Sequence, residues 1–187
     1  RATAVQRWAS FHSRPAPACR VAPVIGDVRP HTHIPMRLDP IEKSGTALSS
    51  VLTAGSVAAE VVAATVALYA RRGYEVPWIG YLANEGGEYI GGCGFAGPAL
   101  HGEAEIAYFT FPGYEGRGVA TEMAGELLRI SRKTATGAGV RFIAHTLPEE
   151  GASTSVLRKL GFVLQGTVLH PEDGTVWKWS ESVRSEA

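Results

Sequence analysis

The chain has 187 residues and a mass of 19.9 kDa, with 45% hydrophobic and 19% charged residues, which is typical of one globular domain and not of a disordered chain. Lys plus Arg and Asp plus Glu are 18 each, so we do not expect a protein that coats nucleic acid through overall positive charge. Two cysteines, Cys19 and Cys93, are too few for a disulfide scaffold or a structural zinc site. We therefore expect a reducing, cytoplasmic compartment.

The first 35 residues differ from the rest of the chain. They carry five Arg and one acidic residue, Asp27, for a charge of +4, which leaves −4 on the remainder. Their five prolines prevent long helices. The composition is shared with organellar transit peptides, but the interpretation we favour is an N-terminal extension of a single domain at residues 36–187. A role of this basic segment in localisation or partner binding is a further alternative.

Residues 46–72 are rich in Ala, Val and Leu, and Val57, Val61, Thr65 and Leu68 fall on one helical face. The window 51–70 has the length of a membrane span. Glu60 lies at its centre, where a charge costs about 2.5–3.5 kcal/mol on insertion scales, and alanines offset little of that cost. We predict one or two packed helices and no membrane partner.

The rest of the chain predicts a mixed α/β order. Short β-type runs come first, and a Gly-rich stretch then precedes a helix with Val119, Met123, Leu127 and Ile130 at helical spacing. The predicted strands are residues 78–83, 88–95, 103–111, 140–146, 162–169 and 175–180, and a second helix is predicted near residues 152–160 with Ala152, Val156 and Leu160 buried. Gly161 supplies a helix stop.

The stretch at residues 112–118 reads PGYEGRG. Glycines at 113, 116 and 118 let backbone N–H groups converge on a ligand, and the following helix adds the positive end of its dipole. The pattern fits a phosphate or pyrophosphate site. It matches neither GxxxxGK[ST] nor GxGxxG, so ATP and dinucleotide sites are not indicated.

Two segments resemble the acyl-CoA-binding motifs of the GNAT N-acetyltransferase superfamily. They are residues 105–108 with 112–122 (EIAY and PGYEGRGVATE), and residues 148–162 (PEEGASTSVLRKLGF). Residues 90–95 (IGGCGF) and 173–179 (DGTVWKW) are similar to the RimJ/RimL-type branch. The resemblance implies a central, mostly antiparallel twisted sheet flanked by helices, with the Gly-rich loop after the fourth strand, and acetyl-CoA as the acetyl donor.

The resemblance also implies the site residues. Glu105 would act as the base near the acceptor amine, and Ser153 would donate a proton to the departing thiolate, although a helix N-cap is an equally good explanation of Ser153. Backbone N–H groups near 109–111 would hold the thioester oxygen. The expected cofactor-binding residues are Phe109, Thr110, Phe111, Gly113, Tyr114, Glu115, Gly116, Arg117, Gly118, Val119, Ala120 and Ser153.

Three positions depart from the superfamily pattern. Gly113 stands where Gln or Arg is usual, Glu150 replaces the Asn that opens the second motif, and Leu157 replaces the Tyr that protonates the thiolate in many relatives. These departures support an alternative of a different class, a non-catalytic CoA-binding or regulatory module with a GNAT fold.

The histidines and remaining candidates carry weaker signals. The pair His31 and His33 has no carboxylate or Cys nearby, so we expect no metal. His101 and His145 could lie near the acceptor site and rank behind Glu105 as bases, together with Glu103. Cys93, Trp177 and Trp179 are expected to serve packing. The resemblance implies a primary amine as acceptor, on a protein N-terminus or a small molecule, and a homodimer is left open.

Overall fold

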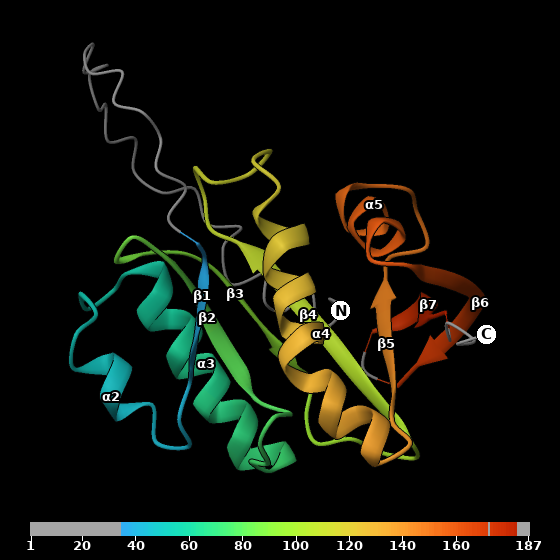
Figure 1. The fold of residues 1–187 in the computed structure, drawn as a ribbon, viewed down its shortest axis with the longest axis horizontal. Helices are drawn as coiled ribbons and strands as arrows, with labels where there is room; N and C mark the ends of the chain where they lie inside the picture. Colours follow the sequence, from blue (N-terminus) through green and yellow to red (C-terminus); the bar gives the residue numbers. More distant parts are fainter. Residues whose placement is uncertain (1–34, 172, 183–187) are drawn as a thin grey trace.

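The computed structural model describes residues 35–171 and 173–182 (Figure 1). The predicted N-terminal extension therefore lies almost wholly outside the described residues and stays a prediction. Within the described ranges, seven strands form one sheet in the order β1-β2-β3-β4-β5-β7-β6. The strands are β1 (Arg37–Pro40), β2 (Gly80–Glu85), β3 (Glu88–Phe95), β4 (Glu103–Thr110), β5 (Arg141–Thr146), β6 (Phe162–His170) and β7 (Gly174–Glu181). The helices are α2 (Thr46–Ser49), α3 (Val57–Arg72), α4 (Val119–Gly137) and α5 (Ala152–Lys159).

Only β4 and β5 run parallel among the paired strands of the described chain, and the other neighbours are antiparallel. The mixed fold with a mostly antiparallel sheet is thus confirmed. The parallel pair needs a long crossover, which the loop at residues 111–118 and α4 supply. The Gly-rich loop follows the fourth strand of the chain, as expected.

Helices α3 and α4 cover opposite faces of the sheet. A Cβ on Gly80 would lie 2.7 Å from Thr65 of α3, and a Cβ on Gly91 would lie 3.1 Å from the sulfur of Met123 of α4. Gly80 pairs with Gly94, and side-chain positions on one strand alternate between faces, so positions 94 and 91 face opposite sides. Ala107 pairs with Gly94, which places Ala107, Glu105 and Glu103 on the face that α3 covers in part.

Helix α3 forms where the Ala- and Val-rich stretch predicted helix. The hydroxyl oxygen of Ser56 caps it by accepting from the amide of Ala59 at 3.2 Å. Its buried face differs from the prediction, because Val61, Val62, Thr65 and Tyr69 are buried while Val57 and Leu68 are half-buried. The Tyr69 hydroxyl donates to the carbonyl of Ile41 and accepts from the amide of Gly80, which fixes the side of α3 that packs on the sheet. Across the described ranges, no helix is long and apolar enough to cross a membrane.

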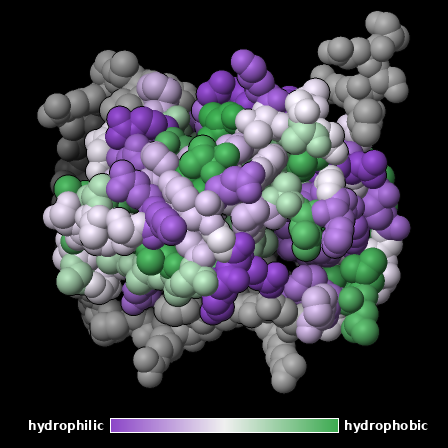
Figure 2. Space-filling model, turned by 90° about the horizontal axis from the view of Figure 1, so that it is seen from below, coloured by the Kyte–Doolittle hydropathy of each residue, from purple (hydrophilic) through white to green (hydrophobic). Residues whose placement is uncertain are grey.

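Helix α5 also buries other residues than predicted. Thr154 and Leu157 are buried, whereas Ala152 is exposed and Val156 and Leu160 are half-buried. The helix ends at Lys159, and Gly161 has a φ of 82°, as its predicted role as a stop requires. The packing roles of Trp179 and Cys93 are confirmed, because both side chains are buried in the core and Trp177 packs against it. On the face seen from below, hydrophobic residues form small separate patches among hydrophilic ones (Figure 2).

Candidate active site

The loop between β4 and α4 contains three glycines whose backbone is not covered by a side chain of their own. Gly113, Gly116 and Gly118 have φ values of 90°, 76° and 84°, which residues with a side chain rarely adopt. A Cβ built on any of the three would meet nothing within 4 Å apart from its chain neighbours, so the space beside these three Cα atoms is open. The loop is therefore open to a ligand that binds backbone N–H groups.

Helix α4 begins at this loop without a side-chain cap. Gly118 is its N-cap, and no side-chain oxygen accepts a hydrogen bond from the first turn. The N–H groups of Thr121 and Glu122 point to the carbonyl of Gly118, and the preceding amides of the first turn have no such partner. The positive end of the 19-residue helix thus faces the loop.

Two charged side chains of the loop already have partners. The amide of Gly113 donates to Oε2 of Glu115 at 2.7 Å, so this carboxylate accepts from an amide that a phosphate would otherwise use. Arg117 is 3.2 Å from Glu85 of β2, and its guanidinium lies over the ring of Tyr114. The Gly113 amide is thus occupied by Glu115, and Arg117 contacts both Glu85 and Tyr114.

Strands β4 and β5 pair over only three residues before they separate. Residues 103–105 pair with 141–143, and the remainder of β4 has a partner in β3 alone. Figure 1 shows the two strands meeting at their first residues and spreading toward the loop and α5. The backbone groups of β4 that face β5 beyond Glu105 are therefore available to a ligand lying between the strands.

The backbone N–H groups expected to hold the thioester oxygen do not all face that opening. The amide of Phe111 donates to the carbonyl of Ile90 at 2.9 Å, on the β3 side. In an antiparallel ladder successive residues point their N–H groups to opposite sides, so Phe109 also faces β3 while Thr110 faces β5. The amides of Phe109 and Phe111 therefore face β3, and Thr110 is the one of the three expected residues whose N–H faces β5.

Glu105 lies at the point where the two strands separate. Its Oε1 is 3.0 Å from Nδ1 of His145 on β5, and both side chains are largely buried. The His145 ring is 5.2 Å, centroid to centroid, from the ring of His170 at the end of β6. Nδ1 of His170 lies in turn 3.0 Å from Oδ2 of Asp173, whose side chain is 1% exposed. Carboxylates and imidazoles from three strands and a turn thus meet on one face of the sheet.

Glu103, two residues earlier on the same face, has a different partner. Both of its carboxylate oxygens accept from Nζ of Lys178, at 2.7 and 2.8 Å. Lys178 pairs with His145 across β5 and β7, so this ion pair borders the Glu105 cluster. Glu103 therefore pairs with a cation, whereas Glu105 lies against the His145 imidazole.

Ser153 is the second residue of α5 and not its N-cap. Gly151 is the N-cap, and the side chain of Thr154 accepts from the amide of Gly151. The cap explanation of Ser153 is therefore wrong. Its hydroxyl has no hydrogen-bond partner among the described residues, and its carbonyl accepts from the hydroxyl of Tyr108 on β4 at 3.1 Å. Burial raises the pKa of Tyr108 and keeps its hydroxyl protonated.

Glu150 pairs with Arg158 of α5. The two side chains form a bidentate pair with both distances 2.6 Å, and Thr154 donates to the same carboxylate. The hydrogen bonds from Arg158 and then Thr154 lower the pKa of Glu150 to about 2. Leu157, which stands where many relatives carry Tyr, is fully buried and cannot donate a proton.

The histidines are the residues that sequence reasoning placed least well. His145 was one of several weak candidates and His170 was not considered, yet both join Glu105. One ligand atom from each of these three residues lies within 4.8 Å of those of the other two. His101 is exposed in a turn, and the pair His31 and His33 lies outside the described residues. In the sequence, the one local hint of this cluster is that His170 precedes Asp173 by three residues.

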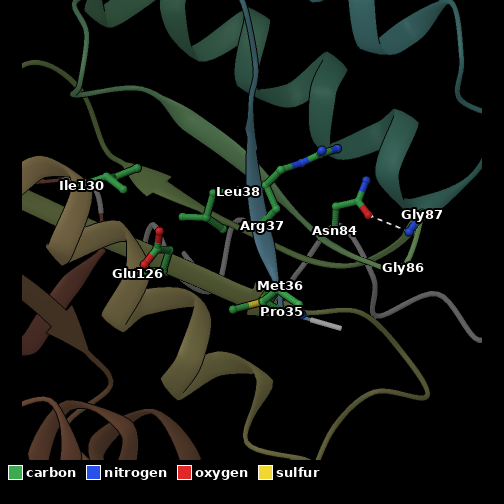
Figure 3. Close-up of a pocket in the computed structure, with 9 residues that line it drawn as sticks. All are labelled: Pro35, Met36, Arg37, Leu38, Asn84, Gly86, Gly87, Glu126 and Ile130. Carbon is green, nitrogen blue, oxygen red and sulfur yellow. Dashed lines mark hydrogen bonds between the residues drawn. The ribbon is translucent and has the colours of Figure 1, made fainter. Parts of the chain in front are cut away.

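A cavity of about 640 Å³ lies elsewhere, between β1, the β2–β3 turn and α4 (Figure 3). Glu126 and Ile130 of α4 line one side, and Asn84 lines the other while its Oδ1 accepts from the amide of Gly87. Neither the Glu105 cluster nor the 112–118 loop contributes a residue. Its titratable lining residues, Arg37 and Glu126, pair with Asp39 and Arg129 respectively, so we do not assign the chemistry to this cavity.

Comparisons with known proteins identify the family to which this fold belongs. The sequence model of the Acetyltransferase (GNAT) domain family matches residues 47–163. The chain belongs to this family and is an acetyl-CoA-dependent N-acetyltransferase. No curated protein matches the sequence.

Solved structures share the fold at low sequence identity. RimL, a ribosomal L7/L12 alpha-N-protein acetyltransferase in complex with coenzyme A, is similar with a TM-score of 0.58 and 20% identity over 82% of this chain and 96% of that one. An acetyltransferase from Salmonella typhimurium that modifies the N-terminal serine of L7/L12 has a TM-score of 0.57 and 18% identity, over 81% and 96% of the chains. A chimera of the spermidine N-acetyltransferase SpeG from Vibrio cholerae and hSSAT gives 0.56 and 16%, over 79% and 95%.

Proposed function

We propose that the chain acetylates a primary amine, on a protein N-terminus or a small molecule, with Glu105 as the general base. The observation that carries the proposal is the position of Glu105, largely buried at the separation of β4 and β5 and on the sheet face opposite α4. A carboxylate there can reach an amine that approaches from one face while the acetyl donor lies between the strands. The neutralised Glu103 lacks this role because Lys178 holds both of its oxygens.

Acetyl-CoA binds with its pyrophosphate on the 112–118 loop and its thioester between β4 and β5. The open glycine backbone and the uncapped start of α4 supply N–H donors for the pyrophosphate. The family resemblance and the RimL structure with coenzyme A support this assignment. The N–H of Thr110 is the donor that faces the thioester oxygen.

The reaction is a direct transfer. The amine nitrogen attacks the thioester carbon, the N–C bond forms, the C–S bond breaks, and Glu105 takes the proton that the amine loses. The thiolate of CoA takes a proton from Ser153, which regains one from solvent, or from a water that Ser153 orders, and Glu105 then releases its proton to solvent. The neutral Tyr108 holds the Ser153 carbonyl and so keeps the start of α5 beside β4.

The proposed setting is the cytoplasm, without a nucleic-acid or membrane partner. Equal numbers of basic and acidic residues in the whole chain support the absence of a nucleic-acid partner. The first test is release of free thiol from acetyl-CoA against a panel of peptides with free N-termini, polyamines and amino acids. Turnover that saturates with one class of amine would identify that class as the acceptor. Acetyl-CoA binding without turnover on any amine contradicts the proposal.

A further inference from the structure

The three side chains at the separation of β4 and β5 form a ligand set that the transfer reaction does not use in full. Two imidazoles and one carboxylate, from Glu105, His145 and His170, bring their ligand atoms within 4.8 Å of one another. Ligands of one Zn²⁺ lie about 2.0–2.1 Å from the ion, so two ligands of a tetrahedral site are about 3.3 Å apart. The 3.0 Å between Glu105 and His145 is close to that spacing.

The nitrogen of His145 that faces Glu105 supplies a second observation. His145 is 8% exposed, and its Nδ1 makes no hydrogen bond within the part of the chain that the structure describes. A buried ring nitrogen without a hydrogen bond is costly, although the Glu105 carboxylate lies close to it. A metal ion between this nitrogen and Glu105 would satisfy both groups.

The surroundings of His170 supply a third observation. Its Nδ1 lies 3.0 Å from the buried carboxylate of Asp173, which directs the other ring nitrogen away from Asp173. A carboxylate behind a histidine is the common arrangement at metal sites, because it fixes the ring and makes the free nitrogen a better ligand. No equivalent carboxylate stands behind the exposed His101 in the described chain.

We propose that this cluster is an inhibitory Zn²⁺ site, with Glu105, His145 and His170 as ligands and a water in the fourth position. Two imidazoles and a single carboxylate favour Zn²⁺ over Mg²⁺ or Ca²⁺, which prefer oxygen ligands. The half-buried side chains of Glu105 and His170 rotate to close the remaining distance to the ion.

The consequence for the enzyme rests on the proposed function. A carboxylate that binds Zn²⁺ cannot take a proton from the amine, and the ion fills the place that the amine nitrogen would occupy. The 112–118 loop is unaffected. Zn²⁺ therefore inhibits in competition with the amine and leaves acetyl-CoA binding unchanged.

The test is titration of the full chain with ZnCl₂ by calorimetry. Wild type should bind at micromolar Zn²⁺, and MgCl₂ should give no heat of binding at this site. His170→Asn and, independently, Glu105→Gln should remove this binding event. Asp173→Asn should weaken it by about 10–100-fold, the usual effect of losing the residue behind a metal-binding histidine. An acetyl-CoA-induced rise in melting temperature shows for each variant that the fold is kept.

Two control variants separate this cluster from the other histidines. His101→Asn and the double variant His31→Asn, His33→Asn should leave the event intact. Zn²⁺ binding that persists in both His170→Asn and Glu105→Gln, or that is lost in the His31, His33 variant alone, overturns the proposal. Zn²⁺ binding by a protein that shows no turnover would support the metal site and contradict the proposed function. Glu105-dependent turnover without Zn²⁺ binding would support the proposed function and contradict the metal site.

Discussion

The two ends of β4 are proposed to serve the same reaction, one through backbone groups and the other through side chains. At its end, residues 112–118 offer backbone N–H groups, and three glycines at positive φ keep side chains out of the way. At its start, Glu105 works through a side chain whose neighbours come from β5, β6 and a turn. The loop should therefore be sensitive to added side chains, and the cluster to the chemical identity of the side chains it has.

The largest expected effect on acetyl-CoA binding comes from filling the loop. Gly118→Asp places a carboxylate beside the pyrophosphate and strains a backbone at φ 84°. A ligand at a hundred times its Kd stabilises the native state by about 2.7 kcal/mol, and the variant should lose this stabilisation in a melting experiment with acetyl-CoA.

Gly87→Asp is the matched control for the loop. Gly87 also has a positive φ, 95°, with nothing within 4 Å of a built Cβ, but it lies in the β2–β3 turn. Gly87→Asp should lose a similar amount of stability to backbone strain, but its melting temperature should still rise fully with acetyl-CoA. An equal rise in melting temperature with acetyl-CoA in the two variants would contradict the assignment of the pyrophosphate to residues 112–118.

Removing the hydroxyl at the start of α5 should have a smaller effect. Ser153→Ala should lower kcat by less than about tenfold, below the usual range for acid–base catalysis, because water can replace a hydroxyl as proton donor. Ser155→Ala, on the exposed side of the helix, should leave kcat unchanged. A loss as large as that expected for a fixed base would make Ser153 the main proton donor.

Freeing the loop amide should strengthen cofactor binding slightly. Glu115→Ala removes the carboxylate that accepts from Gly113 and its repulsion of the pyrophosphate. Acetyl-CoA should bind more tightly by less than about tenfold, the scale of one hydrogen bond. Glu115→Gln removes the charge and keeps an acceptor, so its Kd should lie between those of wild type and Glu115→Ala. Weaker binding in both variants would mean that Glu115 orders the loop for the ligand.

The smallest effect concerns pH. Hydrogen bonds from Arg158 and Thr154 lower the pKa of Glu150 in the folded protein to about 2, so its contribution to stability is complete above the pKa of an unfolded Glu and is lost only as the pH falls toward 2. The difference in Tm between wild type and Glu150→Gln should therefore be the same at about pH 5.5 and about pH 8. Its acetyl-CoA affinity should equal that of wild type, because the carboxylate turns to Arg158. No difference in Tm at either pH would show that the pair does not hold in solution.

The contrast along β4 also explains what could be predicted from the sequence. The loop is contiguous, and glycine spacing with a following helix was enough to predict it. Strand β1 was missed because it has four residues, ends at Pro40, and gains its pairing from β2 more than 40 positions later. No local pattern marks such a strand.

The cluster was only half predicted for the same reason. Glu105 follows from its resemblance to a motif, but His145 reaches it only because Glu105 pairs with Ile143 in the parallel ladder. His170 joins through the pairing of β5, β7 and β6. The buried faces of α3 and α5 were shifted similarly, since the orientation of a helix on a sheet depends on contacts such as that of Tyr69 with Ile41.

The most direct test of the account compares Glu105→Gln with Glu103→Gln, measuring acetyl-CoA Kd and kcat/KM for the identified amine. Both variants keep side-chain shape on the same strand and face. We expect Glu105→Gln to lower kcat/KM by about 10²–10⁴-fold with an unchanged Kd, and the loss to shrink at high pH as the amine becomes neutral without help. Glu103→Gln should cost less than about tenfold, since Glu103 pairs with Lys178. Equal losses in the two variants, or a rate that Glu105→Gln leaves unchanged at every pH, would contradict the assignment of Glu105 as the base.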